Sequence, residues 1–137
     1  MAIKRFFVPT LPGSALSPNA RKHWSAKARD AKQLRTEVAV TVLSVVRQQG
    51  WQDLPFSKAR LEIEVRVCRK KLGADGYYRP RDEDNAQASL KSAIDGLVDA
   101  GVLADDTAKQ LRITKTTLVE IETRSLEGIE FTLGEVA

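Results

Sequence analysis

The amino-acid sequence predicts a single α+β domain over residues 1–137, in the order β-α-β-α-β-β, with two helices packed on a small mixed sheet. Three observations predict it. The chain has the length of one domain and no linker that would divide it. Residues 22–48 repeat apolar side chains at spacings of three and four, as one face of a helix does. Residues 59–68 alternate apolar and charged side chains, as a strand with one buried face does.

The N-terminal half begins with a short strand and continues into the long helix. Residues 3–8 are apolar and aromatic and stop at a proline, which favours a strand. Residues 9–20 contain three of the five prolines and are typical of a loop. We expect the helix to end at Gly50 and its apolar stripe to face the core. Trp24 and Trp51 are expected to pack in the core or at a helix end, and the alternative is that they stack on bases. The stripe consists of Trp24, Ala28, Ala31, Leu34, Val38, Val42 and Val45.

The C-terminal half adds a loop, a second helix and two more strands to the alternating strand. Residues 70–81 are basic, contain glycine and tyrosine, and are expected to form a loop. Apolar residues then recur at helical spacing over 85–100, and Gly101 would end this helix. Residues 110–117 and 128–133 are predicted strands, and this order of elements is typical of an α+β domain.

The composition excludes several classes of protein. Hydrophobic residues make up 42% and charged residues 29% of the chain, which is typical of a globular domain. A single cysteine, Cys68, rules out a disulfide-built scaffold, and a single histidine, His23, leaves too few ligands for a Cys/His zinc site. No apolar run approaches the ~18 residues of a membrane span, so we expect a cytoplasmic protein without membrane contact.

The net charge of +4 is unevenly distributed along the chain. Residues 1–81 carry 17 Lys and Arg against 6 Asp and Glu, whereas residues 82–106 carry 7 acids and 1 lysine. The basic part would attract a phosphate backbone, but the acidic segment would repel it unless divalent cations lie between them. Carboxylate oxygens favour Mg²⁺ or Mn²⁺. The alternative is that both charge blocks are solvated surface.

The acidic segment places carboxylates where a metal ion and a phosphate would meet. Asp82 and Asp84 precede the second helix, and side chains two residues apart in an extended stretch point the same way. The start of a helix also favours anions. Asp84, Lys91 and Asp95 are expected on one helix face, where the lysine would hold a phosphate. The Asp-Asp pair at 105–106 would supply a third carboxylate.

Each of these residues also has a purely structural explanation. Asp84 is a suitable N-cap, and Gln87 would complete a capping box with it. Lys91 and Asp95 would form an ordinary ion pair one turn apart. The Asp-Asp pair at 105–106 is typical of a turn. Taken singly, each residue leaves both explanations open, and only their combination indicates a function.

In combination, these residues resemble those of a known family. Residues 81–85 (Arg-Asp-Glu-Asp-Asn), Leu90-Lys91, the stretch 94–102 and Asp105-Asp106 resemble the RusA family of Holliday junction resolvases, small and often prophage-encoded endonucleases. The match is specific over 81–106 and loose over 9–35. The resemblance implies a RusA-like fold and a dimeric enzyme. It also implies that Mg²⁺ (or Mn²⁺) supports the cutting of four-way DNA junctions by paired symmetric nicks, in recombination and repair.

The resemblance also implies roles for individual residues. Asp82, Asp84 and Asp106 fall on the family's metal-binding, catalytic carboxylates, and Lys91 falls on its catalytic lysine. One departure concerns this lysine, which follows Asp84 by 7 residues where the family has an interval of about four. Three extra residues make almost one helical turn, so the lysine would move ~4.5 Å along the same face.

Basic residues on both sides of the acidic segment are expected to bind DNA. Their contacts with the phosphate backbone would be salt-dependent and largely independent of sequence. Tyr77 and Tyr78 lie in the same basic loop and are further candidates. The expected DNA-binding residues are Lys27, Arg29, Lys70, Lys71, Arg79, Arg81 and Asn85, the last at the asparagine of the family's Asp-Asn pair.

A continuous helix over 85–100 would separate the carboxylates. About sixteen residues span ~24 Å, whereas two ligands of one Mg²⁺ lie within about 5 Å of each other. The chain from Gly101 to Asp106 would return only ~17 Å. Two such helices packed antiparallel about a two-fold axis would bring each helix start to the partner's helix end. We therefore expect a homodimer whose active sites take Asp82 and Asp84 from one subunit and Asp106 from the other.

Two other functions compete with a junction resolvase. A non-catalytic DNA-junction-binding protein would keep the basic surface without a working acid cluster. A less structure-selective metal-dependent nuclease would keep the chemistry without the preference for junctions. Other nuclease classes fit less well, because an HNH enzyme needs at least two histidines and the acid-x-lysine triplet Asp30-Ala31-Lys32 lies within the first helix.

Overall fold

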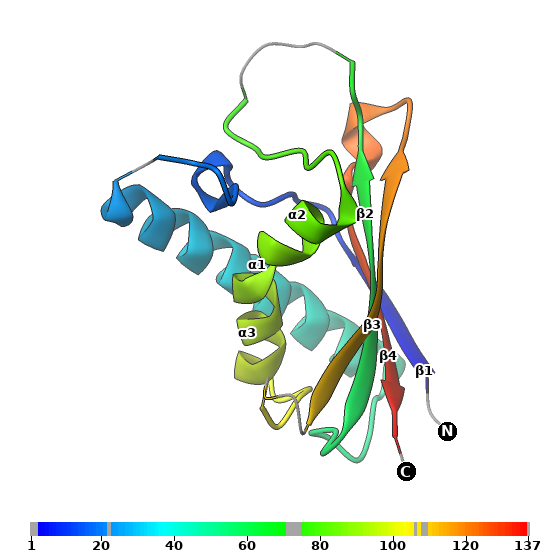
Figure 1. The fold of residues 1–137 in the computed structure, drawn as a ribbon. Coiled ribbons are helices and arrows are strands. Elements are labelled where there is room, and N and C mark those ends of the chain that lie inside the picture. Colours follow the sequence, from blue (N-terminus) through cyan, green and yellow to red (C-terminus); the bar gives the residue numbers. More distant parts are fainter. Residues whose placement is uncertain (1–2, 22, 71–74, 106, 108–109, 137) are drawn as a thin grey trace.

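In the computed structural model, helices cover one face of a four-stranded sheet (Figure 1). The structure describes residues 3–21, 23–70, 75–105, 107 and 110–136. It confirms the predicted α+β class and mixed sheet. The elements are β1 (Ile3–Val8), η1 (Ser14–Leu16), α1 (Trp24–Gln49), β2 (Ala59–Val67), α2 (Glu83–Ala88), α3 (Lys91–Asp99), β3 (Leu111–Glu120), η2 (Arg124–Leu126) and β4 (Gly128–Glu135).

The sheet has the strand order β1-β4-β2-β3. Strand β4 runs antiparallel to both β1 and β2, whereas β2 and β3 are parallel. Parallel neighbours need a long crossover connection. Here the crossover consists of the basic loop, α2 and α3, which places the start of α2 beside the edge strand β3. The predicted acidic segment therefore lies on the crossover.

The core lies between the sheet and the helices. Strand β2 buries one of its two faces, as its alternating sequence predicts. Arg60 and Glu62 face solvent, whereas the apolar residues are at most 1% exposed, namely Leu61, Ile63, Val65 and Val67. On the outer face, Arg66 pairs with Glu64 and with Glu130 of β4. Helix α1 packs on α3, and the closest approach is at Gly96, where a Cβ would lie 2.5 Å from the Arg35 carbonyl oxygen.

The two tryptophans have different environments. Trp51 is 6% exposed and packs against Phe6 with their ring centroids 6.1 Å apart, which confirms its predicted core position. A core position is wrong for Trp24, because it is the first residue of α1 and its side chain is 74% exposed. The first turns of α1 extend past the sheet and past α3 (Figure 1). The apolar stripe of α1 therefore extends beyond the part of the helix that packs on the sheet and on α3.

The predicted helix over 85–100 is in fact two helices. Helix α2 ends at Ala88 and α3 begins at Lys91. At the junction, the Ser89 hydroxyl donates to the Ala86 carbonyl oxygen at 2.8 Å, and the Leu90 N–H bonds the Gln87 carbonyl, one residue short of the regular helical partner. Leu90 is fully buried. The chain thus bends where it buries this leucine, and helical periodicity alone conceals the bend.

None of the helices in the described residues is long and apolar enough to cross a membrane.

Candidate functional site

The start of α2 is organised by Asp82. Its backbone is extended, with φ −144° and ψ 165°, and it is the N-cap of the helix. Its Oδ1 accepts the Asn85 backbone N–H at 2.8 Å, and its Oδ2 accepts from the Asn85 side-chain amide at 3.0 Å. The predicted capping box of Asp84 and Gln87 is therefore wrong. The Gln87 side chain instead accepts from the Thr116 hydroxyl at 2.9 Å, which joins α2 to β3.

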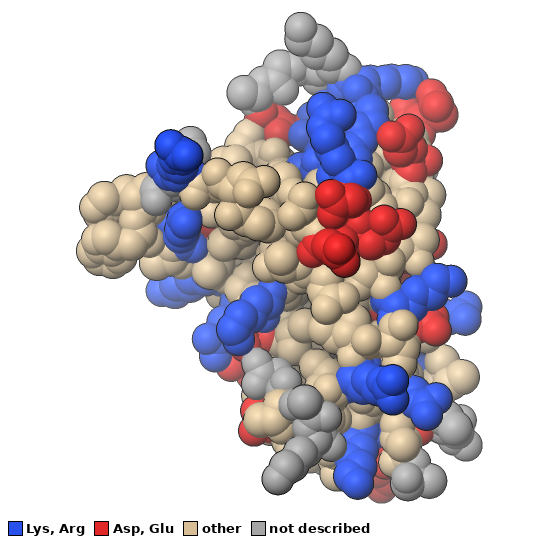
Figure 2. Space-filling view, in the orientation of Figure 1, with Lys and Arg blue, Asp and Glu red and all other residues tan. Residues whose placement is uncertain are grey.

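Asp84 is exposed and belongs to the first turn of α2. The expectation that it points the same way as Asp82 assumed an extended backbone through both residues. Because Asp84 is already helical, its direction follows the helical rotation of ~100° per residue instead. Both carboxylates remain exposed at one helix start, and Figure 2 shows acidic side chains over this region, bordered by Lys and Arg side chains.

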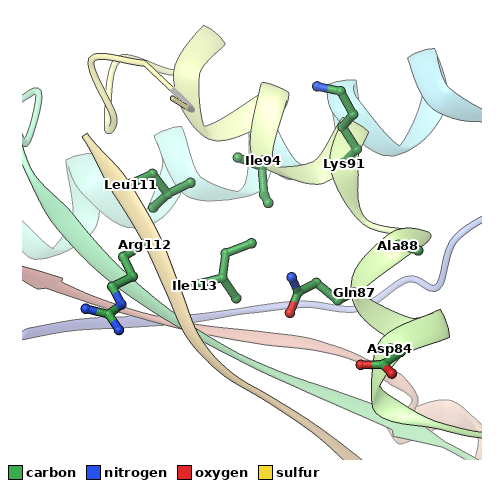
Figure 3. A pocket seen from close by; sticks show the side chains of 8 residues that line it. All are labelled: Asp84, Gln87, Ala88, Lys91, Ile94, Leu111, Arg112 and Ile113. Carbon is green, nitrogen blue, oxygen red and sulfur yellow. The ribbon is translucent and has the colours of Figure 1, made fainter. Parts of the chain in front are cut away.

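Asp84 and Lys91 line the same hollow, which has a volume of about 900 Å³. It lies between the two short helices and β3 (Figure 3). Ile94, Leu111 and Ile113 extend into it, whereas Lys91 and Arg112 carry their charges outward at the rim. Ala88, four residues after Asp84, also lines it. The hollow thus combines an apolar floor with one acidic and two basic side chains.

The prediction that Asp84, Lys91 and Asp95 share one face of one helix is wrong, because Asp84 lies on α2 and the other two residues lie on α3. Asp95 lines a different hollow, between α1 and α3. It still pairs with Lys91, whose Nζ lies 3.9 Å from its Oδ1, and 78% of the Lys91 side chain is exposed. The bend at Ser89 and Leu90 lies between Asp84 and the other two residues, so Asp84 no longer follows the helical repeat of Lys91 and Asp95.

The acidic pair that follows α3 is described only in part. Asp105 is exposed, and Asp106 lies outside the described residues. Figure 1 shows α2 and the chain that leaves α3 at opposite ends of α3. Among the described residues, no group of three His, Cys, Asp or Glu side chains lies close enough to hold a metal ion.

Arg79, predicted to bind DNA, is held within the chain by two carboxylates. Its Nε and Nη2 donate to Glu127 at 2.6 and 2.7 Å, and its Nη1 and Nη2 donate to Asp75 at 3.0 and 2.7 Å. The hydrogen bonds that Arg79 donates to Glu127 and then to Asp75 raise the pKa of Arg79. The hydrogen bond from Arg79 outweighs burial and, with the Tyr77 N–H and the Arg124 charge, lowers the pKa of Asp75 to about 2.

A second arginine fixes the chain that enters α2. Arg69 donates from Nη1 to the Arg79 carbonyl oxygen at 3.0 Å and from Nη2 to the Pro80 carbonyl oxygen. Glu127 also accepts the Cys68 N–H at 2.7 Å, so the end of β2 and the start of β4 are joined at the same carboxylate. Sequence reasoning did not identify Glu127, which is 48 residues from Arg79.

The other predicted DNA-binding residues are distributed over two surfaces. Lys27 and Arg29 are exposed on the first turns of α1, and Arg81 is exposed immediately before α2. Lys70 pairs with Glu122 at 3.3 Å, and both side chains are largely exposed. Asn85 serves the cap of α2, and Lys71 lies outside the described residues. Tyr77 is 43% exposed and forms a backbone bridge with Gly13, which joins the basic loop to the N-terminal segment.

Comparisons with known proteins identify a distant relative. The chain is 29% identical, over 127 residues, to an uncharacterized protein of Xylella fastidiosa (strain Temecula1 / ATCC 700964). The alignment covers 89% of this chain and 71% of that protein. No family model matches the chain. A functional assignment therefore depends on the residues around α2.

Proposed function

We propose that the protein is a divalent-metal-dependent endonuclease of the RusA type, which resolves four-way DNA junctions by paired nicks. The observation that carries the proposal is that Asp84 and Lys91 line one hollow at the start of α2, although the interval between them is longer than in the RusA pattern. A basic surface borders the same helix start (Figure 2), as the binding of a phosphate backbone requires.

Asp82 and Asp84 fit a Mg²⁺ or Mn²⁺ ion by the chemistry of their donors. Both present hard carboxylate oxygens at an exposed helix start. Mg²⁺ is commonly bound by one or two carboxylates, with waters and substrate phosphates completing its octahedron. Asp82 uses two lone pairs for Asn85 and retains others, since a carboxylate has about four acceptor sites. When bound, the ion would activate water and neutralise charge on the phosphate.

Lys91 would hold a non-bridging oxygen of the scissile phosphate. Its ammonium group lies at the rim of the hollow and is largely exposed, so a DNA strand can reach it. A fixed positive charge at that place stabilises the charge that develops during phosphodiester hydrolysis. Arg81, Lys70 and Lys71 would bind the DNA backbone beside it, as would Lys27 and Arg29 on α1. Arg79 would act indirectly, because its guanidinium is used to shape the loop.

The proposal includes a homodimer with shared active sites. The nine residues of α3 alone extend ~13.5 Å, and Asp105 lies beyond their far end. That length exceeds the distance between two ligands of one ion. The carboxylates before α2 and those after α3 would therefore not bind the same ion within one chain. A two-fold axis that sets two copies antiparallel would join Asp82 and Asp84 of one subunit to Asp106 of the other. Two such sites suit paired nicks.

The test of the activity compares a synthetic four-way junction with a linear duplex of the same sequence, in Mg²⁺, Mn²⁺ or EDTA. We expect paired nicks in the junction that need the metal and are lost in Asp84→Asn. Asp53→Asn is the matched control, because Asp53 is exposed in the loop between α1 and β2 and belongs to none of the proposed binding or catalytic residues. Binding without cleavage would support the non-catalytic alternative, and equal cutting of both substrates would support a less selective nuclease.

The test of sharing mixes two inactive proteins. Asp82→Asn/Asp84→Asn lacks one half of each proposed site, and Asp106→Asn lacks the other. Mixed dimers would contain one complete site, so nicking of one strand should return when the proteins are combined. Each variant assayed alone is the control. Mixtures that exchange subunits and remain inactive would refute the shared site.

A further inference from the structure

The first turns of α1 form a projecting arm, residues 23–29, that stands out from the body of the molecule (Figure 1). Six of its seven residues are exposed, and Ala26 is half-buried. Trp24 has the most exposed large apolar side chain of the described residues, at 74%. Its indole ring is therefore available for contact with another molecule.

The projecting arm is an ordered helix start. His23 is its N-cap, and its Nδ1 accepts the Ser25 N–H at 3.2 Å and contacts the Ser25 hydroxyl at 2.8 Å. The His23 and Trp24 rings lie with centroids 5.4 Å apart, at an angle of 39°. The indole is thereby presented on a capped helix, which reduces the entropy lost when a partner binds it.

The charge of this region selects the partner. Residues 21–35 contain six Lys and Arg and a single acid, Asp30. The Asp30 carboxylate is turned inward, since its side chain is 11% exposed and its Oδ2 accepts the Ala15 N–H at 3.1 Å. Arg29 lies 3.6 Å from Asp30, yet 74% of its side chain remains exposed. The surface around Trp24 is therefore basic, as the Lys and Arg side chains along the arm in Figure 2 show.

A path leads from Trp24 along α1 to a neighbouring hollow. Ala28 and Ala31 follow Trp24 at helical intervals of four and seven, so they share its face. Both line a hollow of about 480 Å³ between α1 and α3, and Lys32 lies at its edge. Asp95 and Asp99 also line this hollow and pair with Lys91 and Arg35. The small side chains beside the exposed ring leave room for a flat group on the indole, with a phosphate at Lys32 rather than deeper in the hollow.

We propose that the projecting arm binds an unpaired stretch of nucleic acid, with Trp24 stacking on a base and Lys27, Arg29 and Lys32 contacting its phosphates. Stacking on an exposed aromatic ring and a basic track along the backbone are the two components of single-strand binding. This inference rests on the proposed function, because opened junction arms expose such bases. It adds a contact made at the tip of α1, away from the start of α2.

The test measures the affinity of a labelled single-stranded thymidine oligonucleotide by fluorescence anisotropy, for the wild type and for Trp24→Ala and Trp24→Phe. We expect Trp24→Ala to bind about five- to 150-fold more weakly, the range that loss of one stacked base predicts, and Trp24→Phe to retain most of the affinity. Val40→Ala is the matched control, since Val40 is 62% exposed on the same helix but lies outside the projecting arm. Its affinity should equal that of the wild type.

A second readout uses the intrinsic fluorescence of Trp24. Stacking should quench the wild-type emission when the oligonucleotide is added, and Trp24→Phe, which retains only the buried Trp51, should show little quenching. Equal affinities of wild type and Trp24→Ala would refute the proposal. So would emission that changes with protein concentration alone, because a second copy would then cover the indole. Absence of metal-dependent nicking by the wild type would instead refute the proposed function, whatever Trp24 binds.

Discussion

The Arg79 Nε lies 2.6 Å from Glu127 Oε2, in a pair that joins the basic loop to the start of β4. The Glu127 side chain is 8% exposed and that of Arg79 16%. The same carboxylate oxygen accepts the Cys68 N–H, and the Arg79 carbonyl accepts from Arg69. One buried ion pair thus determines the course of the chain that reaches Asp82, so the candidate site depends on residues remote from it in sequence.

Replacing Glu127 with Gln should destabilise the protein by about 1–3 kcal/mol, because the largely buried Arg79 guanidinium loses one of its two carboxylate partners and keeps Asp75. Glu122→Gln is the control, since its side chain is 90% exposed and its pair with Lys70 should contribute below about 1 kcal/mol. Urea unfolding followed by circular dichroism measures both values. Equal free energies of unfolding for the two variants would show that the Arg79–Glu127 pair contributes nothing to stability.

Stability should fall as the pH drops from about 4 to 2. The pKa of Asp75 is lowered to about 2 and that of Glu127 is lowered as well, where hydrogen bonds and the charges of Arg79 and Arg124 outweigh burial. A lowered folded-state pKa gives stability that is present above the unfolded pKa and lost as pH falls through the folded pKa. Asp75→Asn should therefore show a smaller loss than the wild type over this range. Thermal midpoints measured at each pH test it, and parallel curves would contradict it.

Asp82 should have two separable roles. Because it caps α2, Asp82→Ala should lose about 1 kcal/mol of stability, whereas Asp82→Asn keeps an equally good cap. Under the proposed function, both variants lose the metal-binding carboxylate and with it the cleavage of junctions. Urea unfolding and a nicking assay on the same samples separate the roles. An Asp82→Asn protein that cleaves like the wild type would show that Asp82 acts only as a cap.

The regular periodicities of the sequence predicted most of the fold. The alternation of β2 and the stripe from Leu34 to Val42 each identify a buried face, and both faces are buried. The stripe also includes Trp24, which is exposed, because periodicity shows which side of a helix is apolar and not where the underlying body ends. That limit depends on the length of α1 relative to the sheet, which is a tertiary property.

The candidate site was harder to predict in detail. The sequence identified the acidic segment, but the helix cap was predicted at Asp84 instead of Asp82. Arg79 was predicted to bind DNA, whereas it pairs with Glu127 and Asp75. The two errors have different causes. Asp82 and Asp84 are both suitable caps, and the sequence does not show at which residue the helix begins. Arg79 is paired with Glu127 from a segment far along the chain, and a charged side chain has the same appearance in sequence whether it faces solvent or a buried carboxylate.

The position of the lysine is the sharpest test of the proposed chemistry. Lys91→Ala should reduce junction nicking by about 10²–10³-fold, the usual effect of removing one group that stabilises developing charge. Its stability should change by less than about 1 kcal/mol, because the pair with Asp95 is exposed. Lys115→Ala, an exposed lysine of β3, is the control for the loss of one charge.

A lysine in place of Ala88 would follow Asp84 at the interval of about four residues that the RusA pattern has. Ala88 is exposed and lines the same hollow as Asp84 and Lys91, so a lysine there can reach the same space. Ala88→Lys/Lys91→Ala should regain at least about tenfold of the nicking lost in Lys91→Ala. Recovery would show that a lysine at either position serves one ammonium site, because both positions line the same hollow. If Lys91→Ala nicks junctions at the wild-type rate, the lysine has no catalytic role, and the hollow serves another purpose.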